Sequence, residues 1–344
     1  MANRDIIVIG ASAGGIDALK ELLGGLPGDL PAAVFVVMHV AADSPGVLPR
    51  MLQDTSPLPV AHARDGEPIE RGRVYVAPPD CHLLLERDRV RLSRGPKENL
   101  SRPSIDPLFR SAAYVFGARV VGVVLTGRLD DGTAGLWAVK RRGGAALVQD
   151  PEDATYPSMP RSAIRYVEVD TVAPAAALGP VLARLAGEPP PPERGGEASR
   201  ELEVETRIAR DDNALGAGVL DLGPFTPFTC PECHGVLVSL GEGGVPRFRC
   251  HTGHAYSLDS LLAAVSVSME DTLWTALRAI EEGILLLEHV AGHVRDTARD
   301  DTAADAFEQR AREAERSAAA IRKAVMRHRT LSRDVVRAGG PAAD

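Results

Sequence analysis

Aromatic residues make up only 4% of this 344-residue sequence, and long uninterrupted apolar runs are missing altogether. The second absence argues against membrane insertion, because a spanning helix needs about 20 consecutive apolar residues. Since 44% of the residues are nonetheless hydrophobic, a sizeable core can be buried, built mainly from Val, Leu, Ile and Ala. The formal net charge of −8 disfavours nucleic acid as a partner, because phosphate binding needs a concentrated basic face.

The sequence also shows neither the pattern expected of a signal peptide nor that of a disulfide framework. The first residues, MANRDIIVIGAS, lack a basic region and a long apolar stretch, so we expect a cytoplasmic location. Of the four cysteines, Cys81 stands alone, whereas Cys230, Cys233 and Cys250 cluster beside histidines. In a reducing compartment such clusters usually bind metal.

Short β-branched runs alternate with helical stretches from residue 5 to about 150. The runs 5–9 and 33–39 are mostly apolar, as expected of strands buried on both faces of a parallel sheet. Residues 16–26 between them carry apolar side chains at helical spacing. Further strands are expected at 73–77, 119–126 and 145–149, with a small hairpin at 83–92. The alternation predicts an α/β fold with a doubly wound, mostly parallel sheet in a three-layer αβα arrangement.

The composition changes near residue 186, where a Pro/Gly/Glu-rich stretch begins that should form an extended linker. Beyond the Cys/His segment the chain is rich in Ala, Leu, Glu and Arg. This predicts two long amphipathic helices, broken near 299–302, that pack on each other or on a second copy of the chain. We therefore expect an α/β domain (1–186), a linker (187–222), a Cys/His segment (223–256), a helical region (257–337) and a disordered tail (338–344).

The first strand ends in Gly10-Ala11-Ser12-Ala13-Gly14-Gly15, and a helix is predicted directly afterwards. This matches Gly-x-Ser-x-Gly, in which small residues permit a tight strand-to-helix turn with the serine exposed at its apex. Backbone N–H groups at the helix start would then point at whatever the serine attacks. Nucleotide-binding turns are similar, but the dinucleotide fingerprint requires glycine at the position of Ser12.

Two further strand ends carry partners for this serine. The second strand ends at His39, and the strand near 120–126 leads into a glycine-rich loop with Asp130 and Asp131. Because the carboxyl ends of parallel strands meet at one edge, we expect these groups to share a crevice with Ser12. One carboxylate would accept a hydrogen bond from the Nδ1–H of His39. Taken singly, a loop histidine and an Asp-Asp-Gly helix cap would be ordinary structural features.

Several stretches match one known family in sequence and in order: Ile9–Gly15, Met38-His39, Tyr75–His82, Arg102–Ala113, Leu125–Gly127 with Asp131-Gly132, and Met159–Ile164. As a set they resemble the chemotaxis-type protein-glutamate methylesterases, the CheB catalytic domain family, over about residues 4–185. The resemblance implies Ser12 as nucleophile, His39 as general base and then acid, and Asp131 rather than Asp130 as the orienting carboxylate. It also implies hydrolysis of glutamate γ-methyl esters on methylated chemoreceptors, with glutamine deamidation in many members. This chemistry needs no metal or organic cofactor.

The resemblance further implies an oxyanion site made from the backbone N–H groups of Ala13 and of the loop at Arg128. Here the sequence departs from the family, which usually has a hydroxyl residue at position 13 and Met-Gly in place of Arg128-Leu129. The first strand begins at residue 5, so control by a phospho-receiver domain in cis is not expected. These departures keep a second hypothesis open, a catalytically degenerate methylesterase that serves as a regulatory or scaffold module.

The Cys/His segment has the layout of a zinc ribbon. Two short Cys/His knuckles flank a predicted hairpin at 236–240 and 247–249. Tetrahedral Zn²⁺ takes thiolate and imidazole ligands, and four protein ligands make a closed, structural site. We expect the ligands to be Cys230, Cys233, Cys250 and His254. The alternative is a metal-free loop with reduced thiols.

Overall fold

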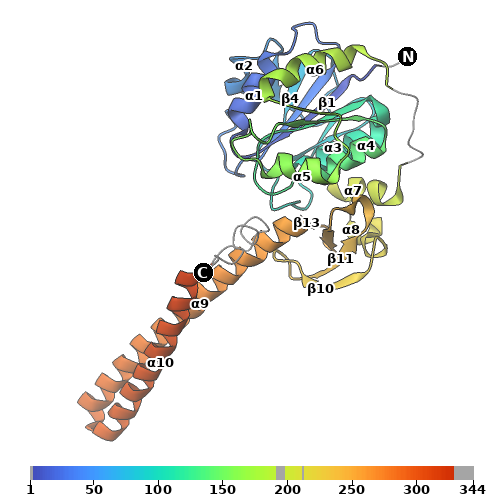
Figure 1. Cartoon of the computed structure of the whole chain (residues 1–344). Coiled ribbons are helices and arrows are strands. Elements are labelled where there is room, and N and C mark those ends of the chain that lie inside the picture. Colours follow the sequence, from blue (N-terminus) through green and yellow to red (C-terminus); the bar gives the residue numbers. More distant parts are fainter. Residues whose placement is uncertain (1–2, 191–197, 211–212, 329–344) are drawn as a thin grey trace, which may run out of the picture. The chain divides into compact units, whose positions relative to one another are not determined.

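The structure, a computed structural model, describes residues 3–190, 198–210 and 213–328. The chain forms two compact units that meet in sequence at Ser260 and Leu261 (Figure 1). The first unit holds the sheet, its helices and the Cys/His segment. The second unit is helical.

A seven-stranded sheet is the centre of the first unit. Its strand order is β3-β4-β2-β1-β7-β8-β9, and every neighbouring pair is parallel. The strands are β1 (Ile6–Ala11), β2 (Ala33–Met38), β3 (Val60–His62), β4 (Arg73–Val76), β7 (Val120–Val124), β8 (Ala145–Gln149) and β9 (Thr171–Ala173). A separate antiparallel hairpin is formed by β5 (His82–Leu85) and β6 (Val90–Ser93). The predicted strands and hairpin are thus present. The expectation missed β3 and β9, which are three-residue edge strands without a buried apolar run.

Helices cover both faces of this sheet, which confirms the predicted three-layer α/β fold (Figure 1). One buried cluster joins the sheet to α1 (Gly15–Gly24), α2 (Leu48–Gln53) and α6 (Ala175–Gly187). The other joins it to α3 (Ile105–Phe116), α4 (Thr133–Arg141) and α5 (Ser158–Tyr166). A short 3₁₀ turn, η1 (Gly117–Arg119), precedes β7. Both clusters are mainly aliphatic, as the scarcity of aromatic residues requires.

The linker expected over 187–222 is corrected in its second part. There the chain forms α7 (Arg200–Ala209), α8 (Ala214–Ala217) and a 3₁₀ turn, η2 (Val219–Asp221). The Ser199 hydroxyl caps α7 by accepting the N–H of Leu202 at 3.1 Å, and α7 packs against α3. The proline-rich composition stops before Ser199, and the sequence after it has one apolar face. The Pro/Gly-rich opening lies mostly outside the described residues.

The Cys/His segment forms a four-stranded antiparallel sheet, which we call the ribbon. Its strands in order are β10 (Phe225–Thr229), β11 (Val236–Leu240), β12 (Arg247–Cys250) and β13 (Ala255–Ser257), with η3 (Glu242–Gly244) between β11 and β12. The predicted hairpin is β11 with β12. A small apolar cluster joins β11 to α7 and α8 through side chains such as Val204, Ile208 and Val238.

The second unit consists of α9 (Leu258–His293, which begins in the first unit), a π-helical turn, η4 (Val294–Ala298), and α10 (Asp301–Arg327). Arg299 has a φ of 52° and Asp300 caps α10, so the break falls where the sequence predicts it. Buried residues of α10 recur every seven positions, at Ala304, Ala311, Ala318 and Val325. This spacing is typical of a helical hairpin. Within the described residues, no helix is long and apolar enough to cross a membrane. The end of the predicted helical region and the tail at 338–344 lie outside the described residues.

Candidate active site

The turn after β1 places Ser12 at the carboxyl edge of the sheet. Its N–H donates to the carbonyl of Thr126 at 3.0 Å, and its carbonyl accepts the N–H of Gly15 at 2.9 Å. Gly14, with a φ of 73°, supplies the left-handed residue before α1. A Cβ on Gly127 would lie 2.8 Å from the Cβ of Ser12, so only glycine lets the loop after β7 pass this close. The serine is half-buried at the apex of the turn.

The imidazole of His39 lies between this serine and Asp131. Its Nδ1 is 3.1 Å from Ser12 Oγ, and its Nε2 is 2.7 Å from Asp131 Oδ2. A carboxylate only accepts, so Nε2–H donates to Asp131 and Nδ1 is left to accept the Ser12 hydroxyl proton. Ser12, His39 and Asp131 therefore form one continuous hydrogen-bonded chain.

The roles of the two ring nitrogens are the reverse of the sequence expectation, which had Nδ1 facing the carboxylate. The strand order explains the difference. Ser12 follows β1, the neighbour of β2, so it is within reach of the ring nitrogen nearer the His39 backbone. Asp131 follows β7 on the far side of β1, so only the distal nitrogen reaches it.

The carboxylate of Asp131 is buried, with 2% of its side chain exposed. Burial acts to raise its pKa, but the hydrogen bond and charge of His39 and the N–H groups of Ile105 and Asn99 hold the pKa well below its ordinary value. The carboxylate is therefore ionised at neutral pH. Its donors are His39 Nε2 (2.7 Å), Ile105 N (2.7 Å), Ser104 Oγ (2.9 Å), Asn99 Nδ2 (2.9 Å), Gly132 N (2.9 Å) and Asp106 N (3.2 Å).

A second buried carboxylate, Asp106, lies beside the first. It accepts from the N–H of Gly135 at 2.6 Å and from Asn99 Nδ2 at 3.1 Å. Burial and the nearby charge of Asp131 raise the pKa of Asp106 to about 8. The full negative charge therefore stays on Asp131. Asp130, the neighbour in sequence, accepts instead from the hydroxyl of Ser257 in the ribbon.

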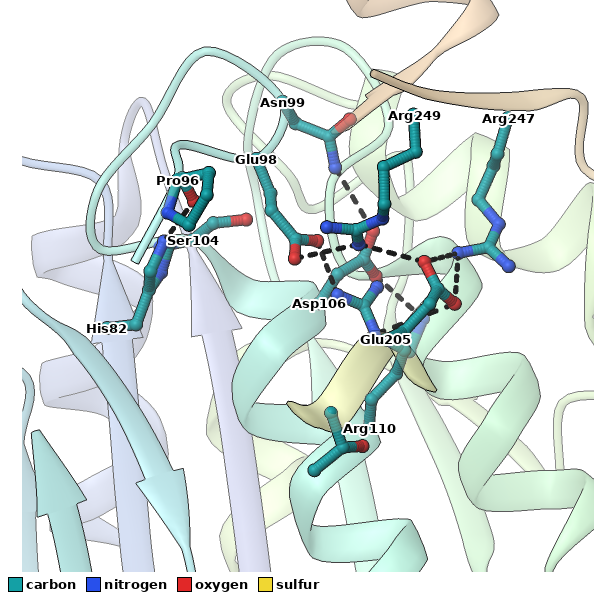
Figure 2. Close-up of polar contacts among 12 residues, drawn as sticks. His82, Pro96, Glu98, Asn99, Ser104, Asp106, Arg110, Glu205, Arg247 and Arg249 are labelled. Carbon is teal, nitrogen blue, oxygen red and sulfur yellow. Dashed lines mark hydrogen bonds and ion pairs between the residues drawn. The ribbon is translucent and has the colours of Figure 1, made fainter. Parts of the chain in front are cut away.

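Figure 2 shows polar contacts made by residues of the loop between β6 and α3, among them Pro96, Glu98, Asn99 and Ser104. His82 is fully buried, and this burial lowers its pKa, so the ring is neutral. Its Nε2 lies 3.0 Å from the Pro96 carbonyl and its Nδ1 accepts the Ser104 N–H at 3.3 Å (Figure 2). His82 and Ser104 each lay in a matching stretch but were given no role, and Asn99 was not singled out.

The two amides predicted to form an oxyanion site belong to Ala13, directly after the serine, and Arg128, directly after Gly127. Among the described residues, neither N–H takes part in a hydrogen bond within the protein. The exposed Arg128 guanidinium lies 5.0 Å from the centre of the Tyr156 ring. Leu129 has a φ of 60°, the left-handed region that favours glycine. The loop thus has the backbone of a glycine turn although the residue is leucine.

The four residues expected to bind metal come together in the ribbon. One ligand atom each from Cys230, Cys233, Cys250 and His254 lie within 4.8 Å of one another. The Cys233–Cys250 sulfur separation is 3.6 Å, and His254 Nδ1 is 3.6–3.7 Å from the sulfurs of Cys250 and Cys230. A tetrahedron with metal–sulfur bonds of 2.3 Å has edges of roughly 3.8 Å, so the cluster could hold a metal ion.

Comparison with known proteins decides the family. A model described as CheB methylesterase matches residues 7–182, just over half of the chain. The chain belongs to this family. It is therefore a member of a family of ester hydrolases, as the six sequence stretches predict.

Individual CheB relatives match the same half. A protein of Leptospira interrogans with the provisional name protein-glutamate methylesterase/protein-glutamine glutaminase is 45% identical over 171 residues, 49% of this chain and 89% of that protein. A protein-glutamate methylesterase/protein-glutamine glutaminase of Anaeromyxobacter dehalogenans is 43% identical over 173 residues, 50% of this chain and 51% of that protein. The chain thus spans about half the length of the second relative.

The fold is also similar to that of a CheB domain whose structure has been solved. The crystal structure of the Thermotoga maritima CheB methylesterase catalytic domain is 35% identical to this chain, with a TM-score of 0.52. The match covers 54% of this chain and 100% of that domain.

Proposed function

We propose that this CheB-family chain is a protein-glutamate methylesterase with Ser12, His39 and Asp131 as its catalytic triad. The hydrogen-bonded chain of hydroxyl, imidazole and ionised carboxylate is the observation that carries the proposal. The names of the relatives support glutamate γ-methyl esters as substrate, with glutamine side-chain amides as a second substrate. The proposed partner is a methylated chemoreceptor, in chemotaxis-type signalling in the cytoplasm.

In the first half-reaction, Ser12 Oγ attacks the ester carbonyl carbon while His39 Nδ1 takes the hydroxyl proton. The ionised Asp131 stabilises the imidazolium through Nε2–H. The oxyanion accepts hydrogen bonds from the N–H of Ala13, in the turn between β1 and α1, and from the N–H of Arg128, in the loop after β7. When the tetrahedral intermediate collapses, the methoxy group takes the proton from Nδ1 and leaves as methanol.

In the second half-reaction, water attacks the acyl-serine and His39 Nδ1 takes a proton from it. Collapse returns this proton to Ser12 Oγ and releases the glutamate carboxylate. With a glutamine amide, the first leaving group is ammonia instead of methanol. No step needs a metal or an organic cofactor.

We further propose that the ribbon cluster binds a structural Zn²⁺. Three thiolates and one imidazole are ligands that zinc prefers, and four protein ligands leave no open position for catalysis. Glu232 Oε2 lies 3.6 Å from His254 Nε2, the ring nitrogen that does not face the sulfurs, which is longer than a hydrogen bond.

The experiment that tests the function is methanol release from a methylated chemoreceptor. The wild-type protein should release methanol, and Ser12→Ala should abolish the release. Ser268→Ala, an exposed serine of α9, is the matched control and should keep the wild-type rate. A wild-type protein without methanol release, or a Ser12→Ala variant with the full rate, would overturn the proposal. The first of these results would favour the degenerate, scaffold alternative.

A further inference from the structure

The loop that carries Asn99 is paired with the ribbon as well as with the α/β domain. The backbone N–H of Asn99 donates to the carbonyl of Ala255 at 2.9 Å, and the N–H of Ala255 donates to the carbonyl of Lys97 at 3.3 Å. Glu98 and Ala255 form an isolated parallel β-bridge. Strand β13 of the ribbon therefore fixes the backbone at Asn99, where φ is 49°.

The Asn99 amide joins the triad to the ribbon. Its Nδ2 donates to Asp131 Oδ1 at 2.9 Å and to Asp106 Oδ2 at 3.1 Å. Its Oδ1 accepts from the backbone N–H of Ser257 at 2.9 Å and from the hydroxyl of Ser260 at 3.0 Å. The donors on the ribbon side thus determine which end of the amide faces the carboxylates, since the nitrogen must face acceptors.

A buried ion network holds the same loop through the preceding residue. Glu98 Oε1 pairs with Arg249 of β12 at 2.9 Å, and its other oxygen pairs with Arg110 of α3 (Figure 2). Arg249 also pairs with Glu205 of α7 at 2.9 Å. None of these side chains is more than 3% exposed. The loop is therefore held from both sides by charges that need their partners.

The metal cluster lies one residue from both ribbon contacts. Cys250 directly follows Arg249, and His254 directly precedes Ala255. The N–H of Cys250 donates to the carbonyl of His254 at 3.0 Å, which closes the knuckle between them. A metal held by Cys250 and His254 would therefore fix the positions of Arg249 and Ala255, the residues that hold the 98–99 loop.

We propose that Asn99 is a positioning residue for Asp131, and that the metal-loaded ribbon sets its orientation, so that ester hydrolysis depends on a metal ion that never contacts the substrate. This inference rests on the proposed triad. The sequence of contacts runs from the metal cluster through Arg249 and Ala255 to Asn99, and from the Asn99 amide to the Asp131 carboxylate and His39. The ribbon is thereby a part of the catalytic unit that metal supply can switch.

The first arm of the test is Asn99→Asp in the full-length protein. This change keeps an acceptor for Ser257 and Ser260 and replaces the donor that faces Asp131 by an oxygen. We expect kcat to fall roughly 10–100-fold with KM changed by less than about twofold, as for other groups that orient a catalytic residue. Asn213→Asp, at the exposed cap of α8, is the matched control because aspartate caps equally well, and it should leave kcat unchanged.

The low-field proton NMR signal of the His39 Nε2–H gives a readout that general destabilisation would not move. We expect it to shift in Asn99→Asp while the amide signals of β1 and β7 keep their wild-type positions. Ser260→Ala, which removes one of the two donors to the Asn99 oxygen, should shift the same signal by less. An unmoved His39 signal together with an unchanged kcat in both variants would overturn the inference.

The second arm removes the metal through Cys233→Ser, with His251→Ala as the matched control outside the cluster. Bound zinc, kcat and the His39 signal are measured in each. Cys233→Ser should lose zinc, lower kcat as Asn99→Asp does, and move the signal in the same direction. The double variant should lose less than the product of the two single losses. Loss of zinc with full kcat and an unmoved signal would overturn the inference.

Ser12→Ala separates this inference from the proposed function. If wild-type hydrolysis is active and depends on Ser12, but neither Asn99→Asp nor Cys233→Ser lowers kcat, only the coupling to the ribbon is wrong. If wild-type hydrolysis does not depend on Ser12, the triad itself is wrong and the inference falls with it.

Discussion

The α/β domain and the ribbon with its α7 support bury different kinds of side chain. The two large clusters of the α/β domain consist of Val, Leu, Ile, Ala and a few aromatic residues on both faces of the sheet. The ribbon and α7 share a much smaller apolar cluster, and beside it lie buried Glu205, Arg247 and Arg249 and the four-residue metal cluster. The first region is stabilised mainly by apolar burial, whereas the second relies more on paired charges and on the proposed metal site.

This difference has a functional consequence. Apolar burial varies little with pH or metal supply, whereas buried ion pairs and metal ligands respond to both. Ser12, the proposed nucleophile, and His39 come from the α/β domain, but the Asp131 carboxylate also accepts from Asn99, and the Asn99 amide accepts in turn from Ser257 of the ribbon. On the proposed mechanism, groups held by apolar packing carry out the chemistry, and a region that responds to pH and metal supports one of them.

The largest effect is expected inside the α/β domain. Asp131→Asn should lower kcat by about 10⁴-fold, because the amide favours the wrong tautomer of His39 and no longer stabilises its charge. The comparison is with Asp130→Asn, since the neighbouring Asp130 is also buried and its carboxylate accepts from Ser257. Methanol release by the two variants measures the difference. Equal losses would contradict the assignment of Asp131.

Removal of the metal should destabilise the ribbon but not the α/β domain. Structural zinc contributes roughly 10–16 kcal/mol to the folding of small domains, so chelation should unfold the ribbon. Hydrogen exchange should then show amides of β11 and β12 losing protection, while those of β1 and β2 keep it. Equal loss of protection in the ribbon and in the α/β domain would contradict the claim that the two regions are stabilised differently.

Breaking one buried ion pair should cost less. Glu205→Gln removes the charge that faces Arg110, Arg247 and Arg249, and we expect a loss of about 3–5 kcal/mol in the free energy of unfolding. Glu203→Gln is the matched control, since Glu203 is exposed on the same helix. Urea unfolding of both variants measures the loss. Similar stability of the two would mean that the network is not stabilising.

The pH dependence of stability tests the same contribution of the Glu205 charge. Burial acts to raise the pKa of Glu205, but the charges of Arg110, Arg247 and Arg249 outweigh it and hold the pKa far below the ordinary value of 4.5. A lowered folded-state pKa gives stability that is present above pH 4.5 and is lost as the pH falls below it. Wild-type stability should therefore approach that of Glu205→Gln in acid. A constant difference between pH 7 and pH 3 would contradict this.

The sequence predicts those parts of the candidate sites that depend on short local patterns. The turn at Ser12, the strand end at His39 and the knuckle spacing of the cysteines are each visible within a few residues. The structure brings Ser12 and His39 together at the carboxyl edge of the sheet and the cysteines together in the ribbon. The catalytic roles and the bound ion stay proposals. The parallel sheet followed from alternating apolar runs, because strands buried on both faces leave a continuous signal.

The remaining features depend on contacts between distant segments. Arg249 and Glu98 are 151 positions apart, and nothing near either residue indicates the other. Asn99 has no motif of its own, and its role depends on β13 arriving beside it. The orientation of the His39 ring follows from strand order, which alternating patterns do not specify. Helix α7 was not predicted, because the proline-rich stretch before it suggested that the whole segment is extended.

The most direct test of the central claim is to map the site of covalent attack. Wild-type protein is treated with a serine-directed fluorophosphonate, digested and analysed by mass spectrometry. We expect a single adduct on the peptide that contains Ser12, and its loss in His39→Ala, because the hydroxyl needs the imidazole to become nucleophilic. An adduct on a different serine, or equal labelling of Ser12 in His39→Ala, would contradict the account.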